Sequence, residues 1–268
     1  MLLLLASILV LFLLNLFLGS VHIPMDSIWN ILWGLDGDES VIWQNIIWKS
    51  RIPQSLTALV AGAGLAVSGL QMQTVFRNPL AGPSVLGISS GASLGVAFVV
   101  LLSGSIGGIA LSRLGFMGEI ALTVAAIVGA LSVMALIVYV SQKVHGNVTL
   151  LIIGVMIGYV ANAVIGVLKF FSVEEDIRAY VIWGLGSFAR VSGNQVTVFI
   201  CIMAVLLPLS FLLIKTLNLL LLGDAYARNL GLNIKRARLQ VIACSGVLVA
   251  IVTAYCGPIT FLGLAVPH

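Results

Sequence analysis

The stretch RIPQSLTALVAGAGLAVSGLQMQTVFRNPLAGPSVLGISSGASLG spans residues 51–95 and carries the strongest structural signal in this chain. Apart from Arg51 at its front, it has a single charge, Arg77, near its middle. The uncharged runs on either side reach about 20 residues, the length that an α-helix needs to cross the hydrocarbon core of a bilayer. Asparagine, proline and glycine gather just after Arg77, as they do in tight turns. We therefore predict two membrane-spanning helices joined by a short turn at residues 76–81.

The composition of the whole chain indicates a lipid environment. Of its 268 residues, 60% are hydrophobic and only 8% are charged. A water-soluble core of this size cannot hide so much apolar surface. In lipid, backbone groups must be hydrogen-bonded within helices or closed barrels, and the alternating pattern of barrel strands is absent from this sequence. We predict an all-α, polytopic integral membrane protein.

The long runs without charged residues give the predicted spans. We place them near residues 2–19, 54–73, 84–103, 119–141, 149–169, 194–214 and 238–256, with an eighth that begins at Pro258. A cleavable secretory signal is the competing interpretation of residues 2–19. That run lacks a positively charged leader and a clear small-residue cleavage site, so we favour a span.

Lysine and arginine near the span ends predict the orientation in the membrane. With the N-terminus inside, the cytoplasmic loops hold Arg77, Lys143, Lys215, Arg228, Lys235, Arg236 and Arg238. Asp224 is the one acid of those loops, and five of the bases lie within residues 215–238. The net charge of +4 therefore reflects membrane topology, and we expect no nucleic-acid partner.

The sequence also limits the chemistry that this chain can perform. Its cysteines and histidines are scattered, without the spacing of a metal site, so we expect no bound metal. The middle of each predicted span lacks an ionisable residue that could relay protons or sodium ions. The glycine-lysine pair of a P-loop does not occur either. We therefore expect no cofactor on this chain, and any ATP-driven process would need a separate subunit to bind ATP and magnesium.

Small residues recur every four positions in two of the predicted spans. They are Gly87, Gly91 and Gly95 in the third span, and Gly154, Gly158 and Asn162 in the fifth. This spacing lets helices approach closely in lipid, and packing is the simpler interpretation of the third span. Asn162 places a polar amide at membrane depth, where polar groups tend to face a cavity. The fifth span is thus a candidate lining of a translocation path, with packing as the alternative.

Two short helices are predicted outside the spans. Asp224 is a favourable N-cap and Gly231 a favourable terminator, which predicts a cytoplasmic helix over residues 225–230. On the outer side, the sequence Ser172-Val173-Glu174-Glu175 matches a capping box and predicts a helix over residues 173–183.

Four sequence blocks follow one another along the chain. They are R-I-P at 51–53 with F-R-N-P-L-A at 76–81, W-G-L-G-S at 183–187, G-D-A-Y-A-R-N-L-G at 223–231 and G-P-I-T-F-L-G-L-A-V-P-H at 257–268. Together they resemble the FecCD family, the membrane permeases of bacterial ABC importers for iron-siderophores, haem and vitamin B12. The resemblance implies a type II ABC importer permease fold of about ten spans, of which about eight are present here. Residues 1–268 would then form a single transmembrane permease domain that lacks the last spans of the family.

The resemblance also implies a function and a set of partners. The permease would pair with a second copy of itself and with two cytoplasmic ATP-binding subunits, and a periplasmic substrate-binding protein would deliver the cargo. It would lie in the bacterial inner membrane and work by alternating access, without being an enzyme itself. We expect iron chelates, siderophore or haem, as cargo, with cobalamin as the alternative. An ion-coupled secondary transporter is a less favoured alternative.

The same resemblance assigns roles to individual residues. Those implied to contact the ATP-binding subunit are Gly223, Asp224, Ala227, Arg228, Leu230 and Gly231. Arg51 is implied to dock the binding protein, and Arg178 is added from its position alone, because Gln54 replaces the second arginine of the family's R-L-P-R. The family-motif residues with a structural role are Arg77, Asn78, Pro79, Gly257, Pro258 and Pro267.

Overall fold

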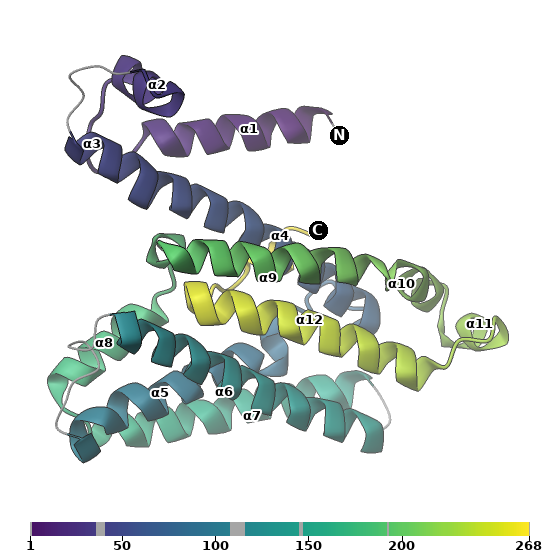
Figure 1. Cartoon of the computed structure of the whole chain (residues 1–268). Helices are drawn as coiled ribbons and strands as arrows, with labels where there is room; N and C mark the ends of the chain where they lie inside the picture. The colour runs from purple at the N-terminus through teal and green to yellow at the C-terminus, as the bar shows by residue number, and fades with distance from the viewer. Residues whose placement is uncertain (1, 36–40, 108–115, 145–146, 192, 268) are drawn as a thin grey trace. The chain divides into compact units, whose positions relative to one another are not determined.

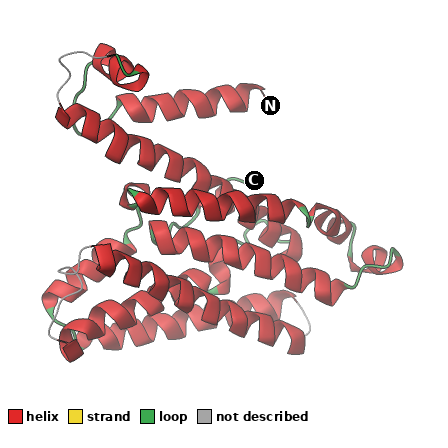
Figure 2. Cartoon of the chain, viewed as in Figure 1, coloured by secondary structure: helices red, strands yellow, loops and turns green. Residues whose placement is uncertain are grey.

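The computed structural model describes residues 2–35, 41–107, 116–144, 147–191 and 193–267 (Figure 1). Every regular element within these ranges is a helix (Figure 2), so the all-α prediction is confirmed. The chain divides into two compact units, residues 1–60 with 188–201, and residues 61–187 with 202–268. The helices α4 (Ile52–Phe76) and α9 (Asn194–Phe211) contribute residues to both units.

The first unit has a small apolar core close to the start of the chain. Its helices are α1 (Leu2–Phe17), α2 (Met25–Trp33), α3 (Val41–Ile46), the π-helical η1 (Ile47–Arg51) and the 3-10 helix η4 (Phe188–Arg190), with the first part of α4. Ile23, Ile28, Ile31 and Ile47 are buried together. Gly34 ends α2 in the left-handed conformation, at φ 64°, which glycine adopts without steric cost.

The second unit contains most of the long helices. They are the 3-10 helix η2 (Pro83–Leu86), α5 (Ile88–Gly107), α6 (Phe116–Lys143), α7 (Asn147–Phe170), α8 (Glu174–Gly184), α10 (Ile214–Leu221), α11 (Asp224–Asn229), α12 (Ile234–Cys256) and α13 (Leu262–Ala265). Within this unit α5 packs against α6, α7, α8 and α12. In α12, 67% of the most apolar stretch is buried, so this helix is an inner element of the unit.

The predicted spans agree with helices, with two differences in where they begin. Five helical stretches are long and apolar enough to cross a membrane, namely Val41–Phe76, Met117–Lys143, Val148–Phe170, Asn194–Phe211 and Ile234–Cys256, and the shorter apolar helices are Leu2–Phe17 and Ile88–Leu102. The third predicted span starts as a helix only at Ile88, because Gly87 interrupts it with φ 74°. The eighth does not begin at Pro258, since Phe261 has φ 66° and the four-residue α13 follows.

The glycines of the third span lie where two helices touch. A Cβ on Gly95 would lie 2.2 Å from the Ala125 carbonyl oxygen of α6, and one on Gly129 would lie 2.2 Å from the Gly91 carbonyl oxygen of α5. No side chain fits at such distances, so only glycine allows the α5 and α6 backbones this approach. The packing interpretation of Gly91 and Gly95 is thereby confirmed.

The predicted turn after α4 is present. The Ala81 amide donates to the Asn78 carbonyl at 3.0 Å, which closes a four-residue turn with Pro79 at its second position. The Asn78 side chain accepts from the Leu80 amide at 2.9 Å, the local bond for which asparagine is favoured in turns. The Gln73 amide group of α4 donates to the Pro79 carbonyl at 2.9 Å and holds the turn against the helix end. The turn prediction at residues 76–81 is confirmed.

Candidate functional site

The short helix α11 forms where the sequence predicts it, but it is capped differently. Gly223, with φ 106°, occupies the N-cap position, and Asp224 is the first helical residue without a side-chain cap bond. The prediction of Asp224 as N-cap is therefore wrong by one position. A carboxylate in the first turn still stabilises the helix dipole, and its oxygens remain free for longer-range partners.

The C-terminal end of α11 follows the prediction. Gly231 has φ 85°, its amide donates to the Arg228 carbonyl at 3.0 Å, and the Leu232 amide donates to the Ala227 carbonyl at 2.9 Å. This pair of bonds is a Schellman motif, which needs a left-handed residue at the position of Gly231. Within the helix Ala227 is fully buried, whereas Arg228 and the following Leu230 are exposed. The helix therefore has one anchored side and presents Arg228 and Leu230 to the outside.

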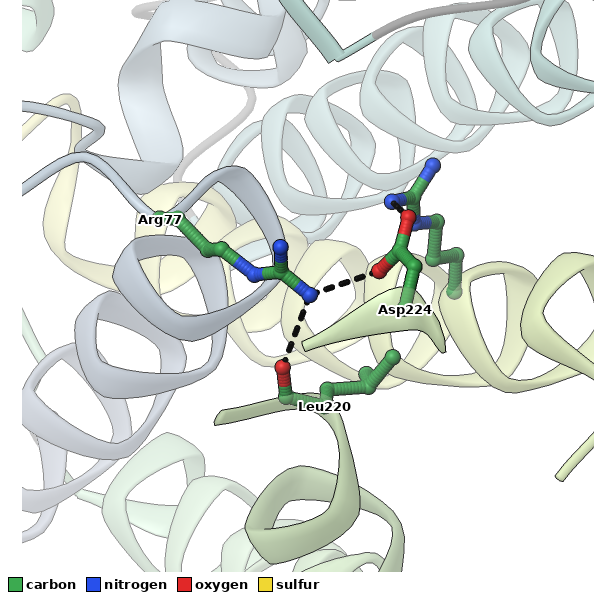
Figure 3. Close-up of polar contacts among 4 residues, drawn as sticks. Arg77, Leu220 and Asp224 are labelled. Carbon is green, nitrogen blue, oxygen red and sulfur yellow. Dashed lines mark hydrogen bonds and ion pairs between the residues drawn. The ribbon is translucent and has the colours of Figure 1, made fainter. Parts of the chain in front are cut away.

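Asp224 joins two parts of the chain that are far from α11 in sequence. Arg77 Nη2 donates to Asp224 Oδ1 at 2.6 Å, and Arg238 Nη2 donates to Asp224 Oδ2 at 2.6 Å. Figure 3 shows the Arg77 guanidinium reaching both Asp224 and the Leu220 carbonyl, the latter at 3.0 Å. Arg77 holds φ 47°, a left-handed conformation that is uncommon for a residue with a side chain. We call these three side chains, Arg77, Asp224 and Arg238, the arginine-aspartate junction.

The arginine-aspartate junction positions α11 and contributes little to the stability of the fold. The side chains of Arg77 and Asp224 are 42% and 41% exposed. Ion pairs with this much solvent contact contribute about 0.2–1 kcal/mol each. Their effect is to tie α11 to the turn after α4 through Arg77 and to α12 through Arg238.

Three loops predicted to share one side of the membrane lie together around this junction. A pocket of about 180 Å³ is lined by the end of α4, the end of α6, the start of α7, α11 and the start of α12. One lining residue from each of these segments is, in the same order, Phe76, Ser141, Leu150, Arg228 and Lys235. This agrees with the predicted alternation of the spans, which places the loops near residues 77, 143 and 215–238 on one side.

At the other end of the second unit, the motif at 183–187 packs against the motif at 257–268. The Ser187 amide donates to the Cys256 carbonyl at 2.7 Å. A Cβ on Gly257 would lie 2.8 Å from the Trp183 carbonyl oxygen, and Gly257 itself has φ 78°. A Cβ on Gly186 would lie 3.2 Å from the Pro258 carbonyl oxygen. Both glycines are thus needed for the two backbones to touch.

The helix α8 matches the prediction over residues 173–183 within one residue, but its capping box is absent. Val173 occupies the N-cap position without a side-chain bond. Ser172 Oγ instead donates to the Leu101 and Leu168 carbonyls, at 3.0 and 2.6 Å, and so joins α5 to the end of α7. The capping-box prediction is wrong because α8 begins one residue later than the box requires, which puts Val173 and not Ser172 at the N-cap position.

The face of α8 that packs inward carries Tyr180. Lys169 Nζ lies 4.8 Å from the centre of the Tyr180 ring, a cation-π contact between α7 and α8. Burial raises the pKa of the Tyr180 phenol above its usual value, and a hydrogen bond with Ser93 acts in the opposite direction. The Tyr180 phenol therefore stays protonated at neutral pH.

The two arginines predicted to dock a binding protein differ in exposure. Arg178 is exposed on α8, whereas Arg51 is only 5% exposed. The Arg51 guanidinium donates to the carbonyls of Leu16, Phe17 and Val21, the first two being at the C-terminal end of α1. A positive charge is favourable at that end of a helix. A docking contact through Arg51 requires these hydrogen bonds to open first.

We expect Arg51→Lys to destabilise the first unit by about 1–3 kcal/mol, because an ammonium cannot reach three carbonyls as the guanidinium fork does. Thermal unfolding of the purified chain measures the change. Arg178→Lys is the matched control and should stay within about 0.5 kcal/mol of the wild type. Equal stability of the two variants would show that the buried contacts of Arg51 have no structural role.

The three residues predicted from sequence to line the translocation path differ in burial in the structure. Gly154 and Gly158 of α7 are buried, and a Cβ on Gly154 would lie 2.8 Å from the Val85 carbonyl oxygen of η2. A Cβ on Gly158 would lie 3.3 Å from Ser90 Oγ of α5. Asn162 is exposed one turn further along α7. Helix packing thus uses the two glycines, and the assignment of the three residues to a path stays a prediction.

Sequence reasoning missed a buried polar contact between α4 and α12. The hydroxyls of Ser68 and Ser245 lie 2.6 Å apart, and each is also 3.2 Å from the other's backbone carbonyl oxygen. Small polar residues form such interhelical bonds in lipid. The signal in the sequence is a serine inside each of two apolar spans, but many such serines bond only within their own helix.

These helices and their charged loop helix define a multi-pass membrane protein of the transport class. The chain belongs to the FecCD transport family, which its residues 7–268 match. The predicted family and permease fold are thereby confirmed.

Known relatives are similar to this chain over most of their length. The chain is 36% identical to the hemin transport system permease protein HmuU of Yersinia pestis, covering 94% of this chain and 73% of that protein. It is 34% identical to the vitamin B12 import system permease protein BtuC of Pectobacterium atrosepticum, covering 90% of this chain and 68% of that protein. A solved metal-chelate type ABC transporter in an inward-facing conformation matches with a TM-score of 0.78 at 29% identity, covering 97% of this chain and 77% of that chain.

Proposed function

We propose that this chain is the membrane permease subunit of an ATP-driven importer that moves iron chelates, haem or siderophore, across the bacterial inner membrane. The observation that carries the proposal is the similarity to a hemin permease over 94% of the chain. Cobalamin is the alternative cargo, because vitamin B12 permeases are nearly as similar. ATP and magnesium would bind to a separate subunit.

The partners follow from the family. Membership implies an ATP-binding subunit and a substrate-binding protein as partners. We propose in addition that two copies of this chain pair around the translocation path and that two ATP-binding subunits dock on their cytoplasmic side. Binding-protein docking would involve Arg178, and Arg51 once it is released from its carbonyl partners.

The segment from Gly223 to Gly231 is proposed as the contact for the ATP-binding subunit. Its support is structural: α11 is short, held at both ends by glycines with positive φ, and tied to two spans through Asp224. A rigid, anchored helix transmits a displacement better than a mobile loop. Arg228 and Leu230, which are exposed, would meet the partner directly.

The path itself is proposed to follow the face of α7 near Asn162. An exposed amide between apolar positions of a spanning helix is expensive in lipid, which supports a water-filled or protein-covered environment. Alternating access would then change the packing of α7 against α5, where Gly158 meets Ser90. ATP binding shifts the two states only if it stabilises one of them more than the other.

The test is uptake into proteoliposomes. The permease is co-purified with its ATP-binding subunit, its binding protein is added, and radiolabelled haem, a ferric siderophore and cobalamin are offered separately. We expect uptake of one iron chelate that requires ATP inside the vesicle and the binding protein outside. Uptake of cobalamin alone would support the alternative cargo.

The control replaces ATP by a non-hydrolysable analogue with all else unchanged. Uptake that persists without hydrolysable ATP and responds to an ion gradient would contradict the proposal and favour a secondary transporter. Uptake without the binding protein would contradict its role in delivery.

A further inference from the structure

The pocket beside the arginine-aspartate junction has a basic rim. Arg228 of α11 and Lys235 and Arg238 of α12 line it, and Asp224 is the one acid among its described lining residues. The surrounding sequence also has an excess of basic residues, with five bases and one acid within residues 215–238. The pocket therefore carries an excess of positive charge.

Much of that charge has no partner within the described part of the chain. Asp224 is already shared by Arg77 and Arg238. Among the described residues Arg228 and Lys235 have no ion pair, and the buried Nε of Arg238 has no hydrogen-bond acceptor. The desolvated Nε of Arg238 is costly to leave without an acceptor, and the exposed charges of Arg228 and Lys235 remain available to an anion that binds beside it.

The inner wall of the pocket is apolar. It is made by Phe76, Leu150, Ile234 and Ile242, each at most 8% exposed. Phe76 ends α4 and Leu150 lies in the first turn of α7, and both helices are long and apolar enough to cross a membrane, so this wall lies at the ends of predicted spans. The pocket thus combines a basic rim with an apolar interior at the membrane boundary.

We propose that this pocket binds the phosphate group of an anionic phospholipid. Basic pockets between helices at the cytoplasmic boundary suit such head groups, because phosphate oxygens accept from arginine and lysine while the glycerol and upper acyl chain contact apolar residues. The positive end of the α12 dipole lies at the same rim and favours an anion there. A free phosphate would use the same basic residues but leave the apolar wall uncovered.

A bound phospholipid would connect α11 with α12, since Arg228 and Lys235 would share one phosphate. The inference needs neither the cargo nor the ATP-binding subunit, because the binding is a property of this chain alone. It can therefore fail while the proposed transport function holds, and the reverse.

The experiment measures lipid binding to the full chain by native mass spectrometry from detergent, in titrations with phosphatidylglycerol, with zwitterionic phosphatidylcholine and with inorganic phosphate. We expect one tightly bound phosphatidylglycerol on the wild type. The double variant Arg228→Gln/Lys235→Gln should bind it at least about tenfold more weakly, because two charge-assisted contacts are lost.

The matched control is Arg236→Gln/Lys215→Gln, which removes the same charge from the same loop at exposed residues that do not line the pocket. It should bind phosphatidylglycerol within about twofold of the wild type. Equal weakening in both double variants would overturn the proposal in favour of general surface attraction. Displacement of phosphatidylglycerol by millimolar inorganic phosphate, or equal binding of phosphatidylcholine, would also overturn the assignment to an anionic lipid.

Discussion

Replacing Asp224 with asparagine is expected to lower ATP-driven uptake by about tenfold while leaving the fold intact. The substitution keeps the shape of the side chain but removes the charge that Arg77 and Arg238 share at 2.6 Å each. At about 0.2–1 kcal/mol each, the two exposed pairs together contribute about 0.4–2 kcal/mol to holding α11 in place, which corresponds to a change in population of about two- to thirtyfold. Uptake into proteoliposomes measures the effect, and thermal unfolding shows that the protein remains folded.

Asp26→Asn is the control for this prediction. Asp26 also lies in the first turn of a short helix, α2, and is exposed, without an ion pair among the described residues. Its variant should transport like the wild type. If Arg238→Gln is added to Asp224→Asn, the loss should not grow, because both changes remove the same contact between Arg238 and Asp224. Wild-type uptake by Asp224→Asn would show that coupling does not pass through the junction.

Gly69→Ala is expected to destabilise the second unit by at least about 3 kcal/mol, the upper end of the usual cost of overpacking. A Cβ at this position of α4 would lie 1.6 Å from the Gly263 carbonyl oxygen and 3.0 Å from Pro267 Cγ. A backbone carbonyl cannot rotate away as a side chain does, so α13 must move. Thermal unfolding measures the loss of stability. Hydrogen exchange at the amides of Leu264 and Val266, which donate within this short segment, reports the local displacement.

Gly62→Ala in the same helix separates this packing effect from the loss of a glycine as such. In the described part of the chain, no neighbouring segment comes within 4 Å of the point that a Cβ on Gly62 would occupy. Since alanine favours helix by about 1 kcal/mol over glycine, this variant should be as stable as the wild type or more so. Equal behaviour of the two variants would mean that the contact between α4 and α13 is absent in the membrane.

Most of the long helices, the turn after α4 and the family of this protein follow from its sequence alone. Charge-free runs of span length predicted the helices, because lipid leaves the backbone few other ways to satisfy its hydrogen bonds. Asn78 and Pro79 specify the turn after α4, and Gly231 the end of α11, because each acts on its own backbone within a few residues. The family can also be identified from the sequence, because its motifs are local blocks in a fixed order.

The partners of individual side chains became known only from the packing of the folded chain. Asp224 lies 147 residues from Arg77 and 14 from Arg238, so local rules predicted its helix but not its bonds. Ser172 was expected to cap α8, but the helix begins one residue too late for that and the Ser172 hydroxyl donates to carbonyls of α5 and α7. The period of the glycines showed which face of α5 is small, but not that α6 covers it. A local sequence pattern predicts the conformation of a segment and which of its groups can bond or pack closely. The partners of those groups depend on residues that folding brings close from elsewhere in the chain.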